Sequence, residues 1–357
     1  MSVRKRGTKW VVRYRDGDLH RSRSFTRKAD ATRFELEMKR RRELVGLAPV
    51  DGGRETLDSF VTETWAPTHG VTLARKTRKD YASSYDRHIA PELGGLELRP
   101  ERIARWQADR LAAGGGPVAV RRALDLLSSI LQRAVELERI PSNPVRLVRH
   151  ARLPRRKEVR PIAPIGVERM RAAAELRDAT MISVMAYSGL RPGELFALRW
   201  NDIRERTILV ERAVSLGAED DTKTTQHRTV RLLAQLSEDL AAWKAASKPR
   251  AGDLVFPGQD DQPWTLYAYQ SWRRPDRAFG RALAAADITG ATPYTLRHSF
   301  ASLLLHEGRS VIYVARQLGH DARLTLTRYG HVIDELEDQP RIPAEQAISE
   351  ARRRLAE

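Results

Sequence analysis

Apolar and polar residues alternate along 10–15 and again along 19–25, and the Asp16-Gly17 pair between these stretches is typical of a tight hairpin turn. From 28 to 44 the apolar spacing changes to that of a helix whose other face is heavily basic. Together these patterns predict a two- or three-stranded sheet with a helix on its back. A ribbon of this size fits a DNA groove, so we expect domain 1–46 to bind duplex DNA.

Helical periodicity then dominates residues 55–148, after a linker at 46–53 that contains Pro49 and a Gly-Gly pair. Turn residues at 91–95 and 114–117 are expected to separate the helices, and two prolines near 141–144 end the set. This region is predicted to be an all-α domain. The expected helices span 56–65, 77–89, 100–111 and 118–137.

A third domain with mixed α and β character, mainly α, is expected at 160–345, followed by a basic tail at 346–357. The extended basic stretch 146–157 precedes it and suits a linker that lies along DNA. Six helices are expected, at 166–174, 178–188, 236–246, 265–286, 295–307 and 311–318. Strands are expected at 207–211, 229–233 and 254–256.

Charge adds a partner to this picture. The formal net charge is +17, and residues 1–50 carry +9 of it, with 15 Lys and Arg against 6 Asp and Glu. Nucleic acid and anionic membrane surfaces are the usual counter-charges, and no apolar run approaches the roughly 20 residues of a spanning helix. We therefore expect double-stranded DNA as the partner, although a solvated basic surface is the plainer interpretation of any one charge. The candidate DNA contacts are Arg4, Lys5, Arg13, Arg15, Lys76, Lys79, Arg87, Arg121 and Arg122.

Cysteine is absent, which excludes disulfides, thiolate zinc sites and cysteine nucleophiles. A reducing cytoplasm fits this composition, and residues 1–10 are too basic and polar for a signal peptide. Any nucleophile must be oxygen or nitrogen.

The segment Gly189-Leu-Arg191-Pro-Gly-Glu194-Leu follows a strongly apolar helix, so Arg191 lies at a turn close to a core. An arginine in such a place is expected to be a buried cation, which needs an anion, and its planar fork suits a carboxylate or a phosphate. From these residues alone, an internal ion pair with Glu194 and a phosphate site are equally good interpretations.

Three further segments near the C-terminus carry polar side chains among core residues. Tyr294, Arg297 and His298 recur at helical spacing, Leu-Gly-His320 closes a helix, and Tyr329 follows nine positions later. Taken singly, a tyrosine such as Tyr329 usually has only a packing or surface role, and a histidine such as His320 usually lies at a helix end or in the core without a catalytic role. Their joint occurrence with Arg191 changes that weighting.

Order, spacing and apolar context in GLRPGEL, LRHSFAS, LGH and TRYGH resemble the motifs of the tyrosine recombinase, or phage integrase, family. The likeness covers about 161–331, and the upstream layout resembles integrases with an arm-type DNA-binding domain and a helical core-binding domain. It implies a tyrosine-recombinase catalytic domain. It also implies that Tyr329 attacks a phosphodiester and stores the bond energy as a phosphotyrosine ester, without a metal or any other cofactor.

The resemblance also implies roles for the other residues. Arg191 and Arg297 would clamp the negative charge of the phosphorane-like state, and His320 would hydrogen-bond the scissile phosphate. A lysine on a β-hairpin would protonate the 5′-oxygen, and Lys223 within 221–230 matches it least tightly, with a surface lysine as the alternative. Glu194 would orient Arg191 or pair within the core. His298 is expected to be buried in its helix or to support the site from behind, rather than to take part in the chemistry directly.

One position departs from the family pattern. Three residues before Arg297 the family usually has a histidine that assists the nucleophile, and this chain has Tyr294. A phenol titrates far above an imidazole and is a poorer base near neutral pH. We expect Tyr294 to position the phosphate instead.

Several functions share these motifs. The first is an integrase that inserts or excises a phage or other mobile element as a homotetramer on two DNA duplexes in a bacterial cytoplasm, with an accessory bending or excision factor. A dimer-resolving recombinase, an inactive DNA-binding regulator and a type IB topoisomerase are the alternatives. The basic N-terminal domain favours the integrase, and the complete set of catalytic residue types argues against an inactive regulator.

Overall fold

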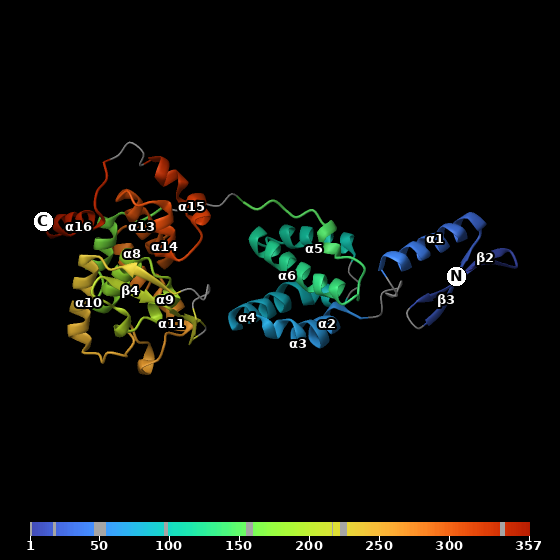
Figure 1. The fold of residues 1–357 in the computed structure, drawn as a ribbon, viewed down its shortest axis with the longest axis horizontal. Helices are drawn as coiled ribbons and strands as arrows, with labels where there is room; N and C mark the ends of the chain where they lie inside the picture. The colour runs from blue at the N-terminus through green and yellow to red at the C-terminus, as the bar shows by residue number, and fades with distance from the viewer. Residues whose placement is uncertain are drawn as a thin grey trace. The chain divides into compact units, whose positions relative to one another are not determined.

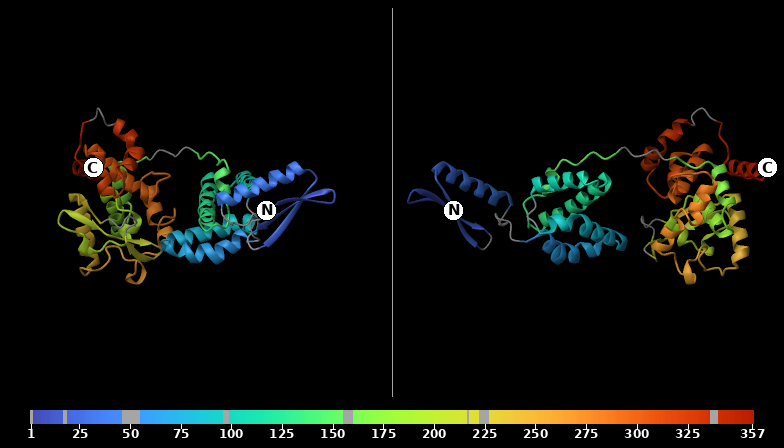
Figure 2. Two further views of the ribbon diagram at one scale, coloured as in Figure 1. Left: turned by 45° about the vertical axis from the view of Figure 1, so that its right-hand side comes forward. Right: turned by 180° about the vertical axis from the view of Figure 1, so that it is seen from behind.

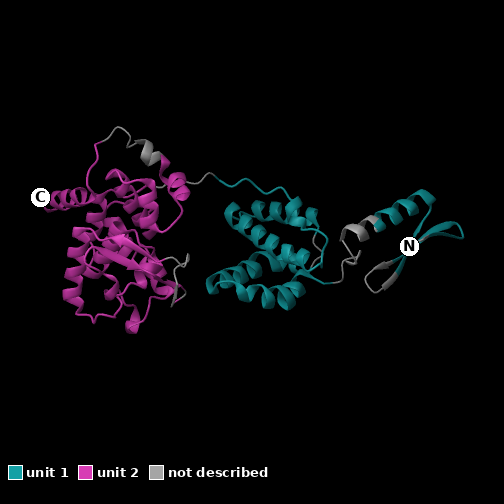
Figure 3. Ribbon diagram, viewed as in Figure 1, with its two compact units in different colours: residues 1–155 teal, residues 156–357 magenta. Residues whose placement is uncertain are grey.

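A computed structural model describes residues 2–16, 19–45, 55–95, 99–154, 160–215, 217–221, 227–335 and 340–357. The chain forms two compact units, Met1–Arg155 and Arg156–Glu357 (Figure 3). Two separate hydrophobic clusters match them, one built from the helices of 57–148 and the other from residues of 162–348. This two-way division is coarser than the predicted domains, so the boundaries at 46 and 345 stay predictions.

The N-terminal sheet has three antiparallel strands in the order β1 (Ser2–Arg6), β2 (Lys9–Asp16) and β3 (Leu19–Phe25), with α1 (Lys28–Val45) lying against it (Figures 1 and 2). Val12 and Tyr14 are buried, and Tyr14 meets Phe34 of α1 edge to face. Because side chains alternate along a strand, Arg13 faces away from α1, and so does Arg4, which pairs with Val11. The predicted sheet with one helix is confirmed.

Helices form the rest of the first unit. Its core gathers around α6, whose buried face includes Leu124, Leu127 and Ile130. The α-helices are α2 (Leu57–Phe60), α3 (Ala66–Thr68), α4 (Arg75–Ser84), α5 (Pro100–Ala112) and α6 (Pro117–Glu136). Wider π-type turns span Val61–Trp65 and Tyr85–Gly94, and short 3-10 turns span Gly70–Thr72 and Pro144–Leu147.

The second unit is mixed, with helices around two small antiparallel sheets, β4 with β7 and β5 with β6. The strands are β4 (Thr207–Val210), β5 (Arg212–Ser215), β6 (Ala218–Asp221) and β7 (Arg228–Arg231). The longer helices are α7 (Pro164–Ala172), α8 (Leu176–Ser188), α10 (Ala234–Ser247), α13 (Pro293–His306), α15 (Ala322–Glu335) and α16 (Ala344–Ala356). The shorter ones are α9 (Pro192–Phe196), α11 (Leu266–Trp272), α12 (Ala278–Ala285) and α14 (Val311–Leu318), with 3-10 turns at Trp200–Asp202 and Gln259–Asp261.

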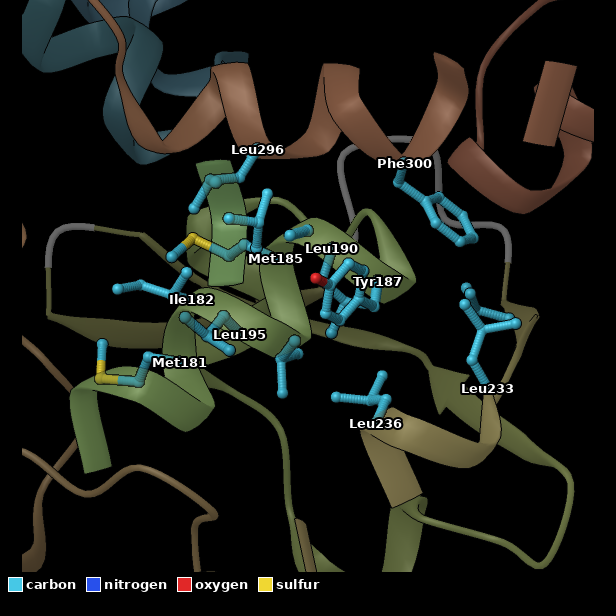
Figure 4. Packing of buried hydrophobic residues seen from close by; sticks show 14 of the residues in the cluster. Met181, Ile182, Met185, Tyr187, Leu190, Leu195, Leu233, Leu236, Leu296 and Phe300 are labelled. Atoms are coloured by element: carbon cyan, nitrogen blue, oxygen red, sulfur yellow. The ribbon is translucent and has the colours of Figure 1, made fainter. Parts of the chain in front are cut away.

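The centre of this unit is the packing of α13 on α8 (Figure 4). Leu296 and Phe300 of α13 are fully buried against α8, whose residues 179–188 are all buried. Burying a large apolar side chain contributes about 1.5–3 kcal/mol, so this contact fixes α13 firmly relative to the end of α8. The ends of these two helices carry the candidate site residues.

Three predicted elements are wrong in detail. The helix expected at 265–286 is interrupted between α11 and α12, because Pro275 lacks an N–H and disfavours helical geometry in the residue before it. The turn expected at 91–95 is instead the end of a helix that continues through Pro91 to Gly94 as a π-type helix, whose wider turn accommodates the ring. Residues 254–256 form only an isolated bridge, from Leu254 to Arg199.

The structure also adds elements that the sequence pattern missed. β5 and β6 form a hairpin beside α9. The last helix, α16, packs on α7 and α10 with Ile348 and Ala351 buried, and it runs across the predicted boundary between catalytic domain and tail. No helix in the described residues is long and apolar enough to cross a membrane.

Candidate active site

Arg191 is held at a sharp turn between α8 and α9. Gly189 ends α8 in the left-handed region at a φ of 64°, and a Cβ there would lie 2.5 Å from Cδ1 of Phe300, so glycine is required. Pro192 then starts α9, with Arg191 capping its N-terminus. The Arg191 guanidinium donates to Glu194 Oε1 at 2.6 Å and to the carbonyl of Gly319 at 2.8 Å.

Arg297 is the more deeply buried arginine, at 5% exposure on α13. Its two terminal nitrogens donate to the carbonyls of Gly189 and Leu318, and it therefore ties the end of α8 to the end of α14. Burial, together with the charge of nearby Arg191, lowers the pKa of Arg297 to about 9. The two predicted arginines are brought together.

Arg228 is a third member that sequence reasoning missed. From the first position of β7 it donates to both oxygens of Glu194, at 2.9 and 2.7 Å, and to the carbonyl of Gln317 at 3.0 Å. Burial alone would raise the pKa of Glu194, but the hydrogen bonds and charges of Arg228 and Arg191 outweigh it and lower this pKa to about 2. Glu194 is thus an ionised bridge between the two arginines.

The C-terminus of α14 is where the three arginines meet. The carbonyls of Gln317, Leu318 and Gly319 accept from Arg228, Arg297 and Arg191 in that order. The last carbonyls of a helix lack intrahelical partners and carry its partial negative charge, so they suit guanidinium donors. Gly319 ends the helix with a φ of 64°. The next residue is His320, so one turn organises the arginines and presents the histidine.

His320 is half-buried. Its Nδ1 lies 3.1 Å from the carbonyl of Asp321 and 3.4 Å from Oγ1 of Thr325. A ring nitrogen that faces a carbonyl carries the proton, so in the neutral ring Nδ1 is protonated and Nε2 holds the lone pair. Burial lowers the pKa of His320, and the charges of Arg297 and Arg191 act in the same direction.

Tyr329 is 2% exposed on α15 and lies beside the arginines. Burial raises its pKa to about 12, even though the charges of Arg297 and Arg328 oppose that rise. Its Oη lies 2.5 Å from Nδ1 of His298. The sequence suggested a supporting place for His298, whereas the structure puts its ring in contact with the candidate nucleophile.

The remaining two candidates lie apart from these contacts. Tyr294 is 50% exposed in the first turn of α13, and it is close enough to Tyr269 of α11 to affect the pKa of that phenol. Lys223 lies outside the described residues, in the segment 222–226 between β6 and β7. Arg228, which begins β7 shortly after that segment, belongs to the arginine cluster.

Comparisons with known proteins place this region in one family. The sequence model described as "Phage integrase family" matches residues 164–335, the region that holds every described residue of the site. The chain is 25% identical over 348 residues to a putative prophage phiRv2 integrase of Mycobacterium tuberculosis, which covers 90% of this chain and 88% of the relative. It is 26% identical over 245 residues to the tyrosine recombinase XerD of Yersinia pestis, covering 67% and 80%.

The chain belongs to the phage integrase family of tyrosine recombinases. As a member of this family it is a site-specific DNA recombinase. Solved structures share its fold: a lambda integrase dimer bound to a COC′ core site has a TM-score of 0.62 at 16% identity, covering 95% of each chain. A Tn1549 transposon integrase in complex with transposon right end DNA has a TM-score of 0.63 at 18% identity, covering 79% of this chain and 97% of that one.

The candidate DNA contacts of this recombinase are all in its first unit. Arg4, Lys5, Arg13, Lys76, Lys79, Arg87 and Arg122 are exposed, Arg121 is half-buried, and the side chain of Arg15 lies outside the described residues. Lys76 pairs with Asp80 and Arg121 with Asp125, each at 3.0 Å and one helical turn away. Such exposed pairs are weak, so these cations are easily redirected to phosphates.

Metal chemistry has no obvious ligand set here. Among the residues that the structure describes, no group of three or more histidines and carboxylates is arranged to hold an ion. The polar groups of the site are three arginines, two histidines, a glutamate and a tyrosine. This donor set suits the binding of a phosphodiester anion through hydrogen bonds.

Proposed function

We propose that this recombinase cleaves and rejoins DNA through a covalent bond between Tyr329 and the 3′-phosphate of the cut strand. The observation that supports this is the position of a buried tyrosine hydroxyl next to Arg297, within a cluster where Arg191 and Arg297 are both fixed by the carbonyls of one helix end. A nucleophile and a fixed anion clamp are the two parts that phosphodiester attack needs.

The arginines stabilise the charge that builds on the non-bridging oxygens. Each guanidinium has five N–H donors, and the bonds to Glu194 and the helix-end carbonyls leave others available for a phosphate. Because these bonds hold the forks in place before DNA binds, little reorganisation is needed during the reaction. The charge of the phosphate would favour the imidazolium form of His320, whose Nε2 then donates a hydrogen bond to that phosphate, and Tyr294 would contact it from the edge of the site.

The leaving 5′-oxygen needs a proton, and Lys223 is the proposed donor. Its segment starts after Asp221 and ends just before Arg228, which is bonded to Glu194. This connection supports a place for the lysine segment at the site, although β6 pairs with β5 and β7 with β4, so 221–230 is not the simple hairpin that the sequence suggested. The phosphotyrosine bond keeps the energy of the broken bond, and a 5′-hydroxyl reverses the step without ATP.

We further propose that the biological reaction is integration or excision of a phage or other mobile element. The prophage integrase matches 348 residues of this chain, whereas the match to XerD covers only 245. Residues 1–46 would bind arm sites, 55–148 would bind core sites and 160–345 would catalyse. The active form would be a homotetramer on two DNA duplexes, assisted by a bending or excision factor, in a bacterial cytoplasm.

The test uses duplexes selected by binding from a random-sequence pool. The wild-type chain should form a covalent protein–DNA adduct with the selected core site, and Tyr329→Phe should form none while binding the same duplex equally well. Tyr313→Phe, another α-helical tyrosine of the same unit, is the matched control and should keep the adduct. An adduct that survives in Tyr329→Phe contradicts the proposal. Efficient relaxation of plasmids without the site would indicate a topoisomerase instead.

A further inference from the structure

The closest polar contact of the Tyr329 hydroxyl is the imidazole of His298. Nδ1 of His298 and Oη of Tyr329 are 2.5 Å apart, and the two rings meet edge to face with centroids 5.7 Å apart. His298 is on α13 and Tyr329 on α15, so the contact joins two helices rather than neighbours in sequence. A neutral imidazole protonated on Nε2 accepts a hydrogen bond at Nδ1, and that is the arrangement a phenol O–H requires.

Other side chains of the site are poorer acceptors for this proton. Arg191 and Arg297 are cations with no lone pair to offer. His320 keeps its Nδ1 proton on the carbonyl of Asp321, and its Nε2 is the nitrogen proposed to face the phosphate rather than Tyr329. Tyr294 stands where related recombinases usually have a histidine, but it is half exposed and its phenol is not a base near neutral pH. The nitrogen that contacts Oη therefore belongs to His298, one residue after Arg297. In the family pattern a histidine stands three residues before this arginine, where this chain has Tyr294.

Charged and titratable groups act on His298 from three elements: Arg297 on its own helix, Arg328 on α15, and His320 after α14, which adds to the effect only when it is protonated. Nη1 of Arg328 lies 3.4 Å from Nε2. A guanidinium only donates, so this long contact is given up in the tautomer that accepts the much shorter contact from Tyr329 at Nδ1. Burial, and then the charges of Arg328 and Arg297, lower the pKa of His298 to about 4. The imidazole is thus neutral at pH 7, which is the form that accepts a proton.

A bound phosphodiester would change that balance. Its negative charge would lie among the same arginines and would favour the imidazolium, because an opposite charge nearby stabilises the charged form. His298 would then gain proton affinity only when DNA occupies the site. Coupling of this kind keeps the tyrosine protonated, and unreactive, in the free protein.

We propose that His298 is the general base that takes the Tyr329 proton during strand cleavage. This inference rests on the proposed covalent role of Tyr329. As the Oη–P bond forms and the P–O5′ bond breaks, the proton of Oη moves to Nδ1 of His298, and the 5′-oxygen takes a different proton from the general acid. In religation the 5′-hydroxyl attacks and gives its proton back to the conjugate base of the general acid, Oη leaves, and His298 returns its proton to Oη.

The decisive variant is His298→Asn, whose side-chain oxygen accepts a hydrogen bond near the position of Nδ1 but takes up no proton. General-base catalysis is typically worth 10²–10⁴-fold, so we expect adduct formation to slow about 10²-fold or more. Binding of the selected duplex and the melting temperature should stay near wild type. His306→Asn, further along the same helix and exposed, is the matched control and should keep full activity. Tyr294→Phe should slow the reaction only modestly.

A substrate with sulfur in place of the bridging 5′-oxygen separates the two proton transfers. A thiolate leaves without a proton, so this duplex dispenses with the general acid but still needs a base. The His298→Asn variant should therefore cleave this duplex as slowly, relative to wild type, as it cleaves normal DNA. In the wild type the cleavage rate should fall as the pH drops below the pKa of His298 in the complex, and in the variant this fall should be absent.

Three results would overturn the assignment. The first is His298→Asn cleaving within about threefold of wild type, which would mean that a hydrogen bond alone is sufficient. The second is rescue of the variant by the 5′-sulfur substrate, which would make His298 part of the acid. The third is a larger loss in Tyr294→Phe than in His298→Asn. If the wild-type chain itself forms no adduct, the proposed function fails and this inference with it.

Discussion

The two units use their positive charge in different ways. In the second unit Arg191, Arg228 and Arg297 are fixed by backbone carbonyls at the end of α14 and by an ionised glutamate. In the first unit the sheet and α4 cations whose side chains the structure describes are exposed, and Lys76 pairs with Asp80 on the same helix surface. A fixed, desolvated charge acts strongly on one atom, whereas a hydrated one contributes mainly to attraction.

This contrast predicts different consequences for the loss of a cation. Removing a fixed arginine should change the rate of the bound complex and leave affinity almost untouched. Removing an exposed one should change affinity and its salt dependence and leave the rate untouched. The following experiments test that division, starting with the largest expected effect.

Arg297→Lys should give the largest loss, about 10³-fold in the rate of adduct formation, because an ammonium cannot serve both carbonyls and also the phosphate. Single-turnover cleavage of the selected duplex measures it. Arg199→Lys is the matched control, since Arg199 also donates to a backbone carbonyl, that of Gly252, but outside the cluster. A rate within about tenfold of wild type would mean that the buried arginine is structural rather than part of the clamp.

Glu194 should make the second unit sensitive to acid. Its pKa is lowered in the folded protein, so its contribution of about 3 kcal/mol is present above pH 4.5 or so and is lost as the pH falls toward 2. Urea unfolding should show that the free energy of unfolding of the wild type decreases as the pH is lowered across that range. In Glu194→Gln the decrease should be smaller. Equal pH dependence of the two proteins would contradict the ionised bridge.

Arg228→Lys should have a smaller effect, about tenfold on cleavage, because it loosens Glu194 and hence Arg191 without removing a group from the clamp. Arg231→Lys is a close control, as Arg231 lies on the same strand and pairs with Glu307 at 2.8 Å, away from the site. The control should lower stability and keep the rate. If both variants cleave alike, Arg228 does not position Arg191.

The sequence predicted those parts of the site that depend on local pattern. The α14 bounds of 311–318 and the turn at Gly189 follow from apolar spacing and the position of the glycines. Pro275 itself was a local signal for the break between α11 and α12. We nevertheless expected one continuous helix, because the apolar periodicity continues on both sides of the proline. Local pattern thus carried most of the fold.

The missed contacts join residues far apart in the chain. Arg228 reaches Glu194 across 34 positions and His298 reaches Tyr329 across 31, and neither residue type is unusual where it stands. Such pairs depend on how α13, α14 and α15 pack and on which rotamer each side chain takes. The sequence offered one hint to the role of Arg228, which is that it stands directly before a predicted strand and just after the segment that contains Lys223. An arginine in that position is equally consistent with an exposed strand edge.

Arg13→Gln should show the smallest effect and complete the contrast. Arg13 is exposed on the sheet face opposite α1, so its loss removes one phosphate contact, weakens binding by about 1 kcal/mol or less and lowers the slope of log K against log salt by about 1. Anisotropy titrations of the full chain at several salt concentrations measure both quantities. Lys39→Gln, on α1 and paired with Glu35 at 3.4 Å, is the control and should leave the slope alone. A change in the cleavage rate of bound core DNA on losing Arg13 would mean that the exposed cations of the first unit also act on the chemistry, and the division between the units would then be wrong.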